Sequence, residues 1–427
     1  MLSDRIALIG YGVSNKAVYE YLKGLGCRFV IRTPNKTDTP DGVINIYGDG
    51  YLDTKEELVF RSPSCLPHKI KGRGHITQEA AFALSNIMGK HIAVTGSDGK
   101  TTVATLIHKI LSGGMRAYLG GNIGYPLINY IGRIGHDDVL VMELSSFQLA
   151  DLHPKTYCSV ITGITPNHLD VHPSYRHYID SKANALVNTS RAVLNFDNNE
   201  VRQLIKRVPR GARLVLASLG DIGALMSDNS DVVYVKDEYI YYNDERIMDK
   251  GSIKLRGDFN VLNVCLAIGA TYELTDRENI RRGVSEFHGV SGRMELIARV
   301  HGVEYYDSSI DSTPSRTSAT LSAFDKRRCI VILGGYDKNL TYECLGDTMR
   351  GVKHAVICGA NSAKIERAIR GRCAYTSVGS FTEAVLVSSH IAEEGDAVIL
   401  SPASASYDMF DNYRQRSEKY KEIVRGL

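Results

Sequence analysis

A glycine-rich loop between a short apolar run and an amphipathic stretch constrains this chain more than any other feature. Residues 92–95 are apolar enough to form a buried strand, and residues 96–102 read Gly-Ser-Asp-Gly-Lys-Thr-Thr. From Thr102 to Leu111 the apolar residues recur with helical spacing, and a Gly-Gly pair then ends the pattern. A strand, a glycine turn and a helix start in this order aim backbone N–H groups and the helix dipole at one point, where a phosphate binds well.

The same loop carries two side chains suited to the phosphates of a nucleotide. Lys100 offers a positive charge for β- and γ-phosphates, and the hydroxyl of Thr101 can ligate Mg²⁺. The spacing is the shorter TGxxGKT form that begins at Thr95, and not the standard GxxxxGK[ST]. A purely structural turn is the alternative, and the strand and helix on either side argue against it. The predicted phosphate-binding residues are Gly96, Ser97, Asp98, Gly99, Lys100, Thr101 and Thr102.

Apolar runs alternate with helical stretches along most of the 427 residues, which predicts an α/β protein with mostly parallel sheets. At roughly 150 residues per domain the length suggests two or three domains. We place the boundaries near residues 88 and 290, which gives domains at 1–88, 89–290 and 291–427. The tyrosine-rich segment 232–242 alternates and predicts a β-hairpin. The predicted strands are 5–9, 28–32, 91–95, 138–142, 158–164, 191–195, 303–306, 328–333, 354–358 and 396–400.

Charge and composition exclude several classes of protein. Lysine and arginine number 51 against 48 acidic residues, so a large nucleic-acid or membrane footprint is not expected. We find no apolar run near the ~18 residues that a membrane helix needs, and no signal-peptide layout at the start. Eight cysteines occur without a CxxC pair, which argues against a zinc ribbon or a disulfide framework. We expect a cytoplasmic protein with buried, reduced thiols.

The N-terminal segment contains a second glycine turn, Gly-Tyr-Gly, after the first predicted strand. It resembles the Rossmann turn GxGxxG, with Asn15 in place of the third glycine. Dinucleotide binding also needs an acidic residue at the end of the second strand, where this chain has Arg32. A phosphorylated nucleotide that is not a redox cofactor is therefore favoured over NAD, and a turn that serves only packing stays open. The candidate residues are Gly10, Gly12, Ser14 and Arg32.

Two further side chains follow predicted strands of the central region. The strand at 138–142 stops at Glu143, where a carboxylate lies on the ligand side of an α/β sheet and suits Mg²⁺. The next strand, 158–164, leads to His168 at the same edge. An isolated histidine is more often structural, but this position favours a role at the phosphates. Lys182 lies on a predicted helix, where a solvated surface lysine is the ordinary expectation.

Taken together, these motifs resemble the Mur ligases, the ATP-dependent amide ligases of peptidoglycan precursor synthesis. The resemblance covers essentially the whole chain in the family's order. It rests on GYGVSN (10–15), TGSDGKTT (95–102), GGNIGYPL (120–127), MELSSFQL (142–149), TPNHLD (165–170), YIDSKAN, NFDNN (195–199), LRGDFNVLNVCLA (255–267), GRMEL (292–296), YYDSS (305–309), GGYDKNL (334–340) and SPASASYDMFDNY (401–413). Within the family, ELSSFQL, GGYDKNL and SPASASYDMF favour the branch that adds D-glutamate to UDP-N-acetylmuramoyl-L-alanine.

The resemblance implies three domains, namely a Rossmann-like N-terminal domain, a central P-loop-type ATPase domain and a Rossmann-like C-terminal domain. It implies that ATP phosphorylates the substrate carboxylate and that the amine of D-glutamate displaces the phosphate. Such an enzyme serves cell-wall biogenesis, cell shape and cell division, as a cytoplasmic monomer. Two alternatives stay open: a sister ligase with a different amino-acid acceptor, and a non-catalytic nucleotide-binding relative.

The resemblance also implies roles for single residues, with Lys100, His168 and Lys182 as the catalytic set. Thr101 and Glu143 would bind one Mg²⁺, and His168 a second one together with Lys182 as a carbamate. The remaining implied contacts are Asn122 and Ser145 for the muramoyl-alanine part, Asn260 and Arg293 for the adenine or phosphates, Asp307 for the ribose, and Lys338, Ser406 and Tyr413 for D-glutamate. The chain departs from the family at residues 307–312, where DSSIDS replaces DSKATN, so that Ser309 or Arg316 would take over a lysine's contact.

Overall fold

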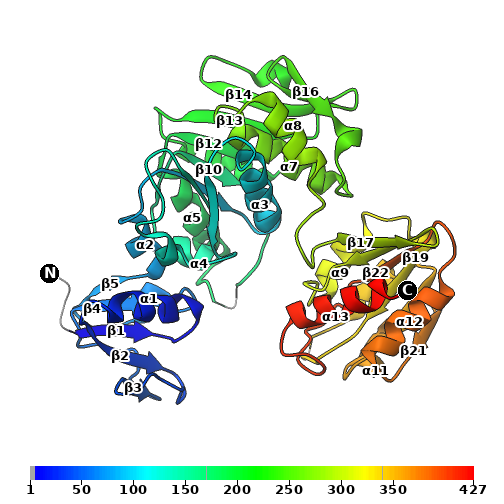
Figure 1. Cartoon of the computed structure of the whole chain (residues 1–427), viewed down its shortest axis with the longest axis horizontal. Helices are drawn as coiled ribbons and strands as arrows, with labels where there is room; N and C mark the ends of the chain where they lie inside the picture. The colour runs from blue at the N-terminus through cyan, green and yellow to red at the C-terminus, as the bar shows by residue number, and fades with distance from the viewer. Residues whose placement is uncertain (1–4, 170, 339) are drawn as a thin grey trace. The chain divides into compact units, whose positions relative to one another are not determined.

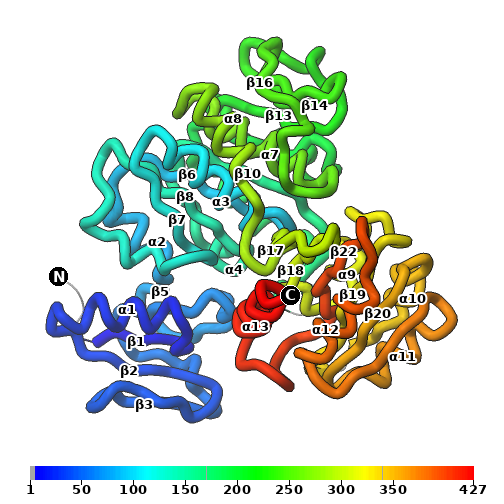
Figure 2. The backbone as a smooth tube through the Cα atoms, turned by 45° about the vertical axis from the view of Figure 1, so that its right-hand side comes forward, coloured from blue at the N-terminus to red at the C-terminus, as the bar shows by residue number. Residues whose placement is uncertain are grey.

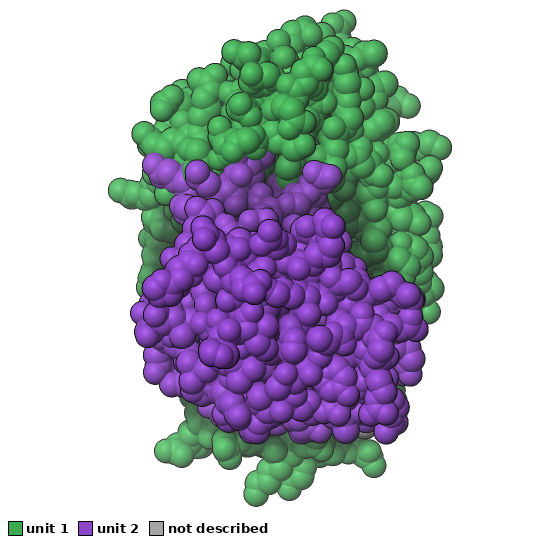
Figure 3. Space-filling model, turned by 90° about the vertical axis from the view of Figure 1, so that its right-hand side faces the viewer, with its two compact units in different colours: residues 1–252, 261–285 green, residues 253–260, 286–427 purple. Residues whose placement is uncertain are grey.

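The computed structural model of this protein describes residues 5–169, 171–338 and 340–427 (Figure 1). The chain forms two compact units, one of residues 1–252 and 261–285 and the other of residues 253–260 and 286–427 (Figure 3). In the described residues, each unit is built from helices and mainly parallel sheets, which confirms the predicted α/β class. The domain boundaries near 88 and 290 stay predictions.

The first unit begins with a five-stranded parallel sheet in the order β3-β2-β1-β4-β5. Its elements are β1 (Arg5–Ile9), α1 (Val13–Lys23), β2 (Arg28–Thr33), β3 (Ile44–Tyr47), β4 (Leu58–Arg61), β5 (His75–Thr77) and α2 (Glu79–Leu84). The sequence predicted β1, α1 and β2 but not the last three strands. Strands β3 and β4 have four residues each and β5 has three, so all three are too short for an apolar period to stand out.

A nine-stranded sheet forms the rest of the first unit, in the order β16-β15-β14-β13-β12-β10-β6-β8-β7. Its strands pair in parallel except for the antiparallel pairs β14–β15 and β15–β16, which confirms the predicted hairpin and adds one strand to it. The strands are β6 (Lys90–Thr95), β7 (Ala117–Gly121), β8 (Val139–Glu143), β10 (Cys158–Ile161), β12 (Arg191–Asn195), β13 (Arg213–Ser218), β14 (Ser230–Lys236), β15 (Tyr239–Tyr242) and β16 (Glu245–Asp249). The main helices are α3 (Lys100–Leu111), α4 (Ser146–Leu149), α5 (Tyr175–Ala183), α6 (Asn199–Gln203), α7 (Asp258–Thr271) and α8 (Arg277–Ser285).

The second unit contains a six-stranded sheet in the order β17-β18-β22-β19-β20-β21, parallel except for β17. Separate apolar clusters cover its two faces, with α9 to α11 on one and α12 and α13 on the other. The elements are β17 (Glu295–Val300), β18 (Val303–Asp307), α9 (Pro314–Leu321), β19 (Cys329–Leu333), α10 (Glu343–Thr348), β20 (His354–Ile357), α11 (Ser362–Ile369), β21 (Tyr375–Ser377), α12 (Phe381–Ile391), β22 (Ala397–Leu400) and α13 (Tyr413–Arg425). Arg256, from the short segment 253–260, donates to the Tyr306 hydroxyl at 2.5 Å and pairs with Glu304.

One apolar core joins the first two sheets. Ile6 and Leu8 of β1 belong to the same buried cluster as Leu140 of β8 and Leu149 of α4. Helix α2 carries the chain from β5 to β6 (Figure 2) and packs against the short helix Leu127–Tyr130. A shared core of this kind holds the N-terminal sheet and the nine-stranded sheet in one compact unit.

The carboxyl group of Glu79, at the start of α2, is an exception in this core. It is 3% exposed and accepts a hydrogen bond from the backbone N–H of Ile128 at 2.7 Å. Burial raises the pKa of Glu79 to about 7, against the opposing effect of the backbone hydrogen bonds. Because the carboxyl must ionise in a buried place, the folded state loses stability as the pH rises from about 4.5 to about 7.

Replacing Glu79 with glutamine is therefore expected to raise the free energy of unfolding at pH 8, by up to about 3 kcal/mol. The gain should shrink towards zero below about pH 4.5, because both side chains are then neutral. Urea unfolding at pH 5 and at pH 8 measures this difference. Glu57→Gln, at an exposed carboxyl nearby, serves as the control, and an equal gain at both pH values would contradict the prediction.

Two other properties of the chain bear on its setting. Within the described residues, the helices are all too short or too polar to cross a bilayer. All eight cysteines are free thiols, as the sequence analysis expected. Only four of them are buried, and Cys344 is exposed, so the expectation of uniformly buried thiols was wrong.

Candidate active site

The structure confirms the predicted strand and helix as β6 and α3, with the glycine turn between them. Gly96 has φ +147° and Gly99 has φ +80°, values that L side chains rarely adopt. A Cβ atom at Gly96 would lie 2.0 Å from the Thr162 hydroxyl, and one at Gly99 would lie 2.6 Å from Asn263 Oδ1. Both positions therefore need glycine, and the turn brings backbone N–H groups to the start of α3.

Lys100, the first residue of α3, folds back over this turn. Its Nζ donates to the carbonyl oxygens of Gly96 at 3.0 Å and Ser97 at 2.8 Å. The Ser97 hydroxyl lies 2.8 Å from the hydroxyl of Tyr178 and donates to the carbonyl of Thr165. The ammonium group is thus held at the rim of the loop, where it can meet an incoming phosphate.

Glu143 lies next to the loop, at the end of β8, as the sequence predicted. Its side chain is 2% exposed. One carboxylate oxygen accepts from the Thr101 hydroxyl at 2.6 Å, and the other accepts from the amide of Asn122 at 2.8 Å. A hydroxyl and a carboxylate oxygen side by side are the hard donors that Mg²⁺ prefers, so these residues fit a magnesium site.

Lys182 lies on α5, yet it is 2% exposed and is not a surface residue. Its Nζ donates to the carbonyl of Gly96 at 2.6 Å and lies 4.6 Å from the centre of the Tyr178 ring. Burial and the nearby charge of Lys100 hold the pKa of Lys182 well below its usual value, although Asp98 and Glu143 oppose this. The ordinary expectation of a solvated lysine was wrong, and the structure places this amine at the phosphate loop.

His168 lies on a loop further from a strand than the sequence predicted. The predicted strand 158–164 ends at Ile161, and His168 is exposed with φ +55°. Its ring meets the ring of Phe147 edge-on at 5.0 Å, while His172 stacks on the same ring at 5.1 Å. Among the described residues, no three or more His, Cys, Asp or Glu side chains form a group that could hold a metal ion. The role of His168 as a ligand stays a prediction.

The side chain of Asn15 stabilises the N-terminal glycine turn through hydrogen bonds to its backbone. Its amide donates to the carbonyls of Ile9 at 2.9 Å and Gly10 at 2.8 Å. Arg32 is 4% exposed and donates twice to Glu56, at 3.2 and 3.1 Å. Sequence reasoning missed Glu56, because the partner comes from the segment before β4 and not from the end of β2. The charge of Arg32 is therefore paired, and its contact with a phosphate stays a prediction.

In the second unit, Asp307 contacts α13, Tyr413 is the first residue of α13, and Ser406 is buried on the loop between β22 and α13. Asp307 is fully buried and accepts hydrogen bonds from Ser309 and Ser417, and its burial raises its pKa. Arg416, also buried, donates to the carbonyls of Ser309, Ser404 and Ala405. Arg416 thereby ties the loop after β18 to the loop after β22. Nothing in the sequence pattern marked it.

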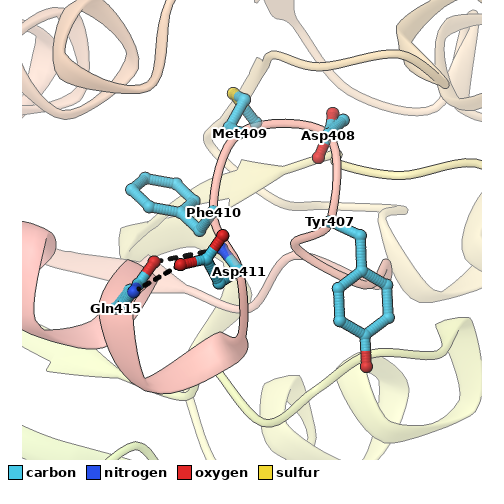
Figure 4. Close-up of a pocket in the computed structure, with 6 residues that line it drawn as sticks. All are labelled: Tyr407, Asp408, Met409, Phe410, Asp411 and Gln415. Carbon is cyan, nitrogen blue, oxygen red and sulfur yellow. Dashed lines mark hydrogen bonds between the residues drawn. The ribbon is translucent and has the colours of Figure 1, made fainter. Parts of the chain in front are cut away.

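Lys338 lies on the loop after β19, with Nζ 5.7 Å from the centre of the Tyr407 ring. Tyr407 also lines a pocket of about 520 Å³ in the loop between β22 and α13 (Figure 4). That pocket holds none of the predicted site residues, and its lining is Tyr407, Asp408, Met409, Phe410, Asp411 and Gln415. Asn260 donates to the carbonyl of Arg256, and Asn260 and Arg293 both belong to the second unit.

Comparison with known proteins agrees with this geometry. Residues 94–271 match the Mur ligase middle domain, and residues 292–404 match the Mur ligase glutamate ligase domain. A protein of Ruminiclostridium cellulolyticum named UDP-N-acetylmuramoylalanine–D-glutamate ligase is 36% identical over 100% of this chain and 97% of its own length. Ligases of the same name from Clostridium tetani and Acetivibrio thermocellus are 34% and 35% identical, with the same coverage. This chain belongs to the Mur ligase family.

Solved structures support the same assignment at the level of the fold. A UDP-N-acetylmuramate–alanine ligase of Thermotoga maritima aligns over 99% of both chains, with TM-score 0.62 and 17% identity. A MurF ligase of the same organism, solved with ADP, aligns over 99% of this chain and 95% of its own, with TM-score 0.57 and 15% identity. This Mur ligase therefore has the three-domain fold class that the sequence predicted.

Proposed function

We propose that this Mur ligase uses ATP to join D-glutamate to UDP-N-acetylmuramoyl-L-alanine in peptidoglycan precursor synthesis. The observation that carries the proposal is the convergence of Lys100, Thr101, Glu143 and Lys182 on one glycine loop. It occurs in a chain matched from end to end by relatives that bear this ligase's name. A non-catalytic relative would have no need to retain all four side chains together.

The chemistry requires activation of a carboxylate. The terminal phosphate of ATP passes to the free acid of the muramoyl-alanine substrate, which gives an acyl phosphate and ADP. The amine of D-glutamate then attacks the acyl carbon, and phosphate leaves. Lys100 offsets the negative charge that collects where carboxylate meets triphosphate. Two Mg²⁺ ions, one held by Thr101 and Glu143 and one by His168 with carbamylated Lys182, would supply further positive charge.

The surroundings of Lys182 favour carbamate formation. A carbamate forms when a neutral amine attacks CO₂, so that an N–C bond forms and the nitrogen loses a proton. The lowered pKa of Lys182 increases the share of the neutral amine relative to an ordinary lysine. Once carbamylated, the side chain is an anion with oxygen donors, as a metal ligand must be.

The substrates would bind to separate groups of residues. Gly10, Gly12, Ser14 and Arg32 are proposed for the nucleotide, and Asn122 and Ser145 for the muramoyl-alanine part. Asn260, Arg293 and Asp307 are proposed for the adenine, phosphates and ribose of ATP, and Lys338, Ser406 and Tyr413 for D-glutamate. The free cysteines support a reducing compartment, the cytoplasm, and we propose that the enzyme acts there as a monomer.

The decisive experiment measures ADP release and product mass with purified enzyme, Mg²⁺, ATP and UDP-N-acetylmuramoyl-L-alanine. D-glutamate, L-glutamate, L-lysine and L-alanine are supplied in turn. Only D-glutamate should give ADP and a lengthened nucleotide-peptide. Turnover with another amino acid alone would identify a sister ligase, and ATP binding without turnover would identify a non-catalytic relative.

Replacing Lys338 with alanine is expected to raise the KM for D-glutamate at least tenfold, because the ammonium is proposed to pair with one of its two carboxylates. The KM for ATP should change less than twofold. Steady-state kinetics with each substrate varied in turn measures both values. Lys419→Ala, at a lysine on α13 that pairs with Glu422, is the control. An equal rise in both KM values would rule out a specific contact with D-glutamate.

A further inference from the structure

Arg61, the last residue of β4, is fully buried, although it carries a charge. Its Nε donates to Asp151 Oδ2 at 2.8 Å, and its Nη2 donates to the carbonyl of Phe147 at 2.9 Å and to Asp151 Oδ1. Its Nη1 points the other way, to the carbonyls of Ser62, Pro63 and Cys65 at 3.2 to 3.3 Å. The guanidinium therefore connects two segments that are far apart in the sequence.

One of these segments lies against the N-terminal glycine turn. The backbone N–H of Ser62 donates to the carbonyl of Ile9 at 2.8 Å. A Cβ atom at Gly10 would lie only 2.8 Å from the Ser62 hydroxyl, so loop and turn are in close contact. By holding residues 62–65, Arg61 supports the turn that is proposed to bind the nucleotide.

The other segment is α4 and the residues after it. Ser145 caps α4 with its side chain and is proposed to lie along the muramoyl-alanine part of the substrate. Phe147 and Asp151, the partners of Arg61, follow Ser145 closely. Gln78 reinforces the same joint, because its amide donates to the carbonyl of Gln148 at 2.8 Å and to Asp151. The joint therefore links the nucleotide turn to the segment proposed for the other end of the substrate.

A buried ion pair is weak evidence for stability, because well-packed apolar residues often replace one at no loss. Its better-attested use is to fix one arrangement of the parts it joins. Arg61 fits that use, since its donors are divided between Asp151, a carbonyl of α4 and the carbonyls of the loop 62–65.

We propose that Arg61, through Asp151, is a positioning residue that fixes the spacing between the two ends of the sugar-nucleotide site. This inference rests on the proposed function, because it concerns the binding of UDP-N-acetylmuramoyl-L-alanine. The affinity for a substrate that contacts both ends depends on the distance between them and therefore senses a change in it. UDP alone reaches only one end, and ADP binds at the phosphate loop, so neither senses it.

The test compares binding of three ligands to the full-length wild-type enzyme, Arg61→Met and Asp151→Asn by titration calorimetry. Asp151→Asn is the milder variant and leaves the contacts of Arg61 with residues 62–65 in place. Both variants should bind UDP-N-acetylmuramoyl-L-alanine at least tenfold more weakly than the wild-type enzyme does. In Asp151→Asn, which keeps the support of the nucleotide turn, the affinity for UDP should change less than threefold. The affinity for Mg-ADP should change less than twofold in both variants.

Arg191→Met is the matched control. Arg191 is also a buried arginine of the first unit, 3.6 Å from Asp231, and it lies outside the proposed substrate segments. Its loss should lower the melting temperature without changing affinity for the full substrate. Unchanged binding in Arg61→Met and Asp151→Asn, an equal loss for all three ligands, or the same loss in Arg191→Met would overturn the inference. A wild-type enzyme that fails to bind the full substrate would instead refute the proposed function.

Discussion

Replacing Lys182 with alanine is expected to lower kcat on the order of 100-fold or more. The substitution removes the proposed carbamate, a negatively charged metal ligand at the site of phosphate transfer. The side chain is buried, its amine contacts the carbonyl of Gly96, and its pKa is well below the usual value. These properties favour a neutral amine that can become a carbamate. ADP release with all three substrates at saturation measures the effect.

Supplying a small carboxylate tests the chemical basis of this loss. Acetate should restore part of the activity of Lys182→Ala, since it can occupy the space of the missing carbamate. Lys90→Ala, at an exposed lysine at the start of β6, should behave as wild type with or without acetate. A Lys182→Ala enzyme with unchanged turnover would refute the carbamate.

Replacing Lys100 with alanine is expected to lower kcat/KM for ATP on the order of 100-fold or more. Two effects combine: the phosphates lose a positive charge, and the loop loses the bonds from Nζ to the carbonyls of Gly96 and Ser97. The affinity for ADP should fall as well, because this contact exists before any chemistry. Lys109→Ala, at an exposed lysine on the same helix, is the control. Full activity in Lys100→Ala would refute the role of Lys100 in binding the phosphates.

The sequence predicted the phosphate loop closely because the determinants are local. The left-handed turn at φ +80° requires a glycine, and the helix shows an apolar period over adjacent residues. Both signals can be read from a short stretch of sequence. The strand predicted at 158–164 ran too far, because its pairing with β6 and β12 ends at Ile161. The hydroxyl of the next residue, Thr162, donates to the carbonyls of Thr95 and Asp98. Apolar periodicity alone does not reveal such a bond.

Side chains whose role depends on distant contacts could not be predicted. Lys182 becomes buried only when α5 packs against the loop 86 residues earlier in the chain. Arg61 and Asp151 are 90 residues apart, and the other hydrogen bonds described for Arg61 go to backbone carbonyls, which carry no residue signature. Glu56 was missed because it is also distant in the sequence from its partner, Arg32. The sequence analysis had expected Arg32 to contact a phosphate.

The path of the chain between the two units limits how this ligase can be taken apart. The chain enters the second unit at residues 253–260, returns to the first for residues 261–285, and then enters the second again. Arg256, on the short first visit, anchors that segment to Glu304 and Tyr306. A fragment that starts at residue 286 would leave Glu304 without this arginine. Grafting the second unit of one relative onto the first unit of another therefore calls for three splice points, not one.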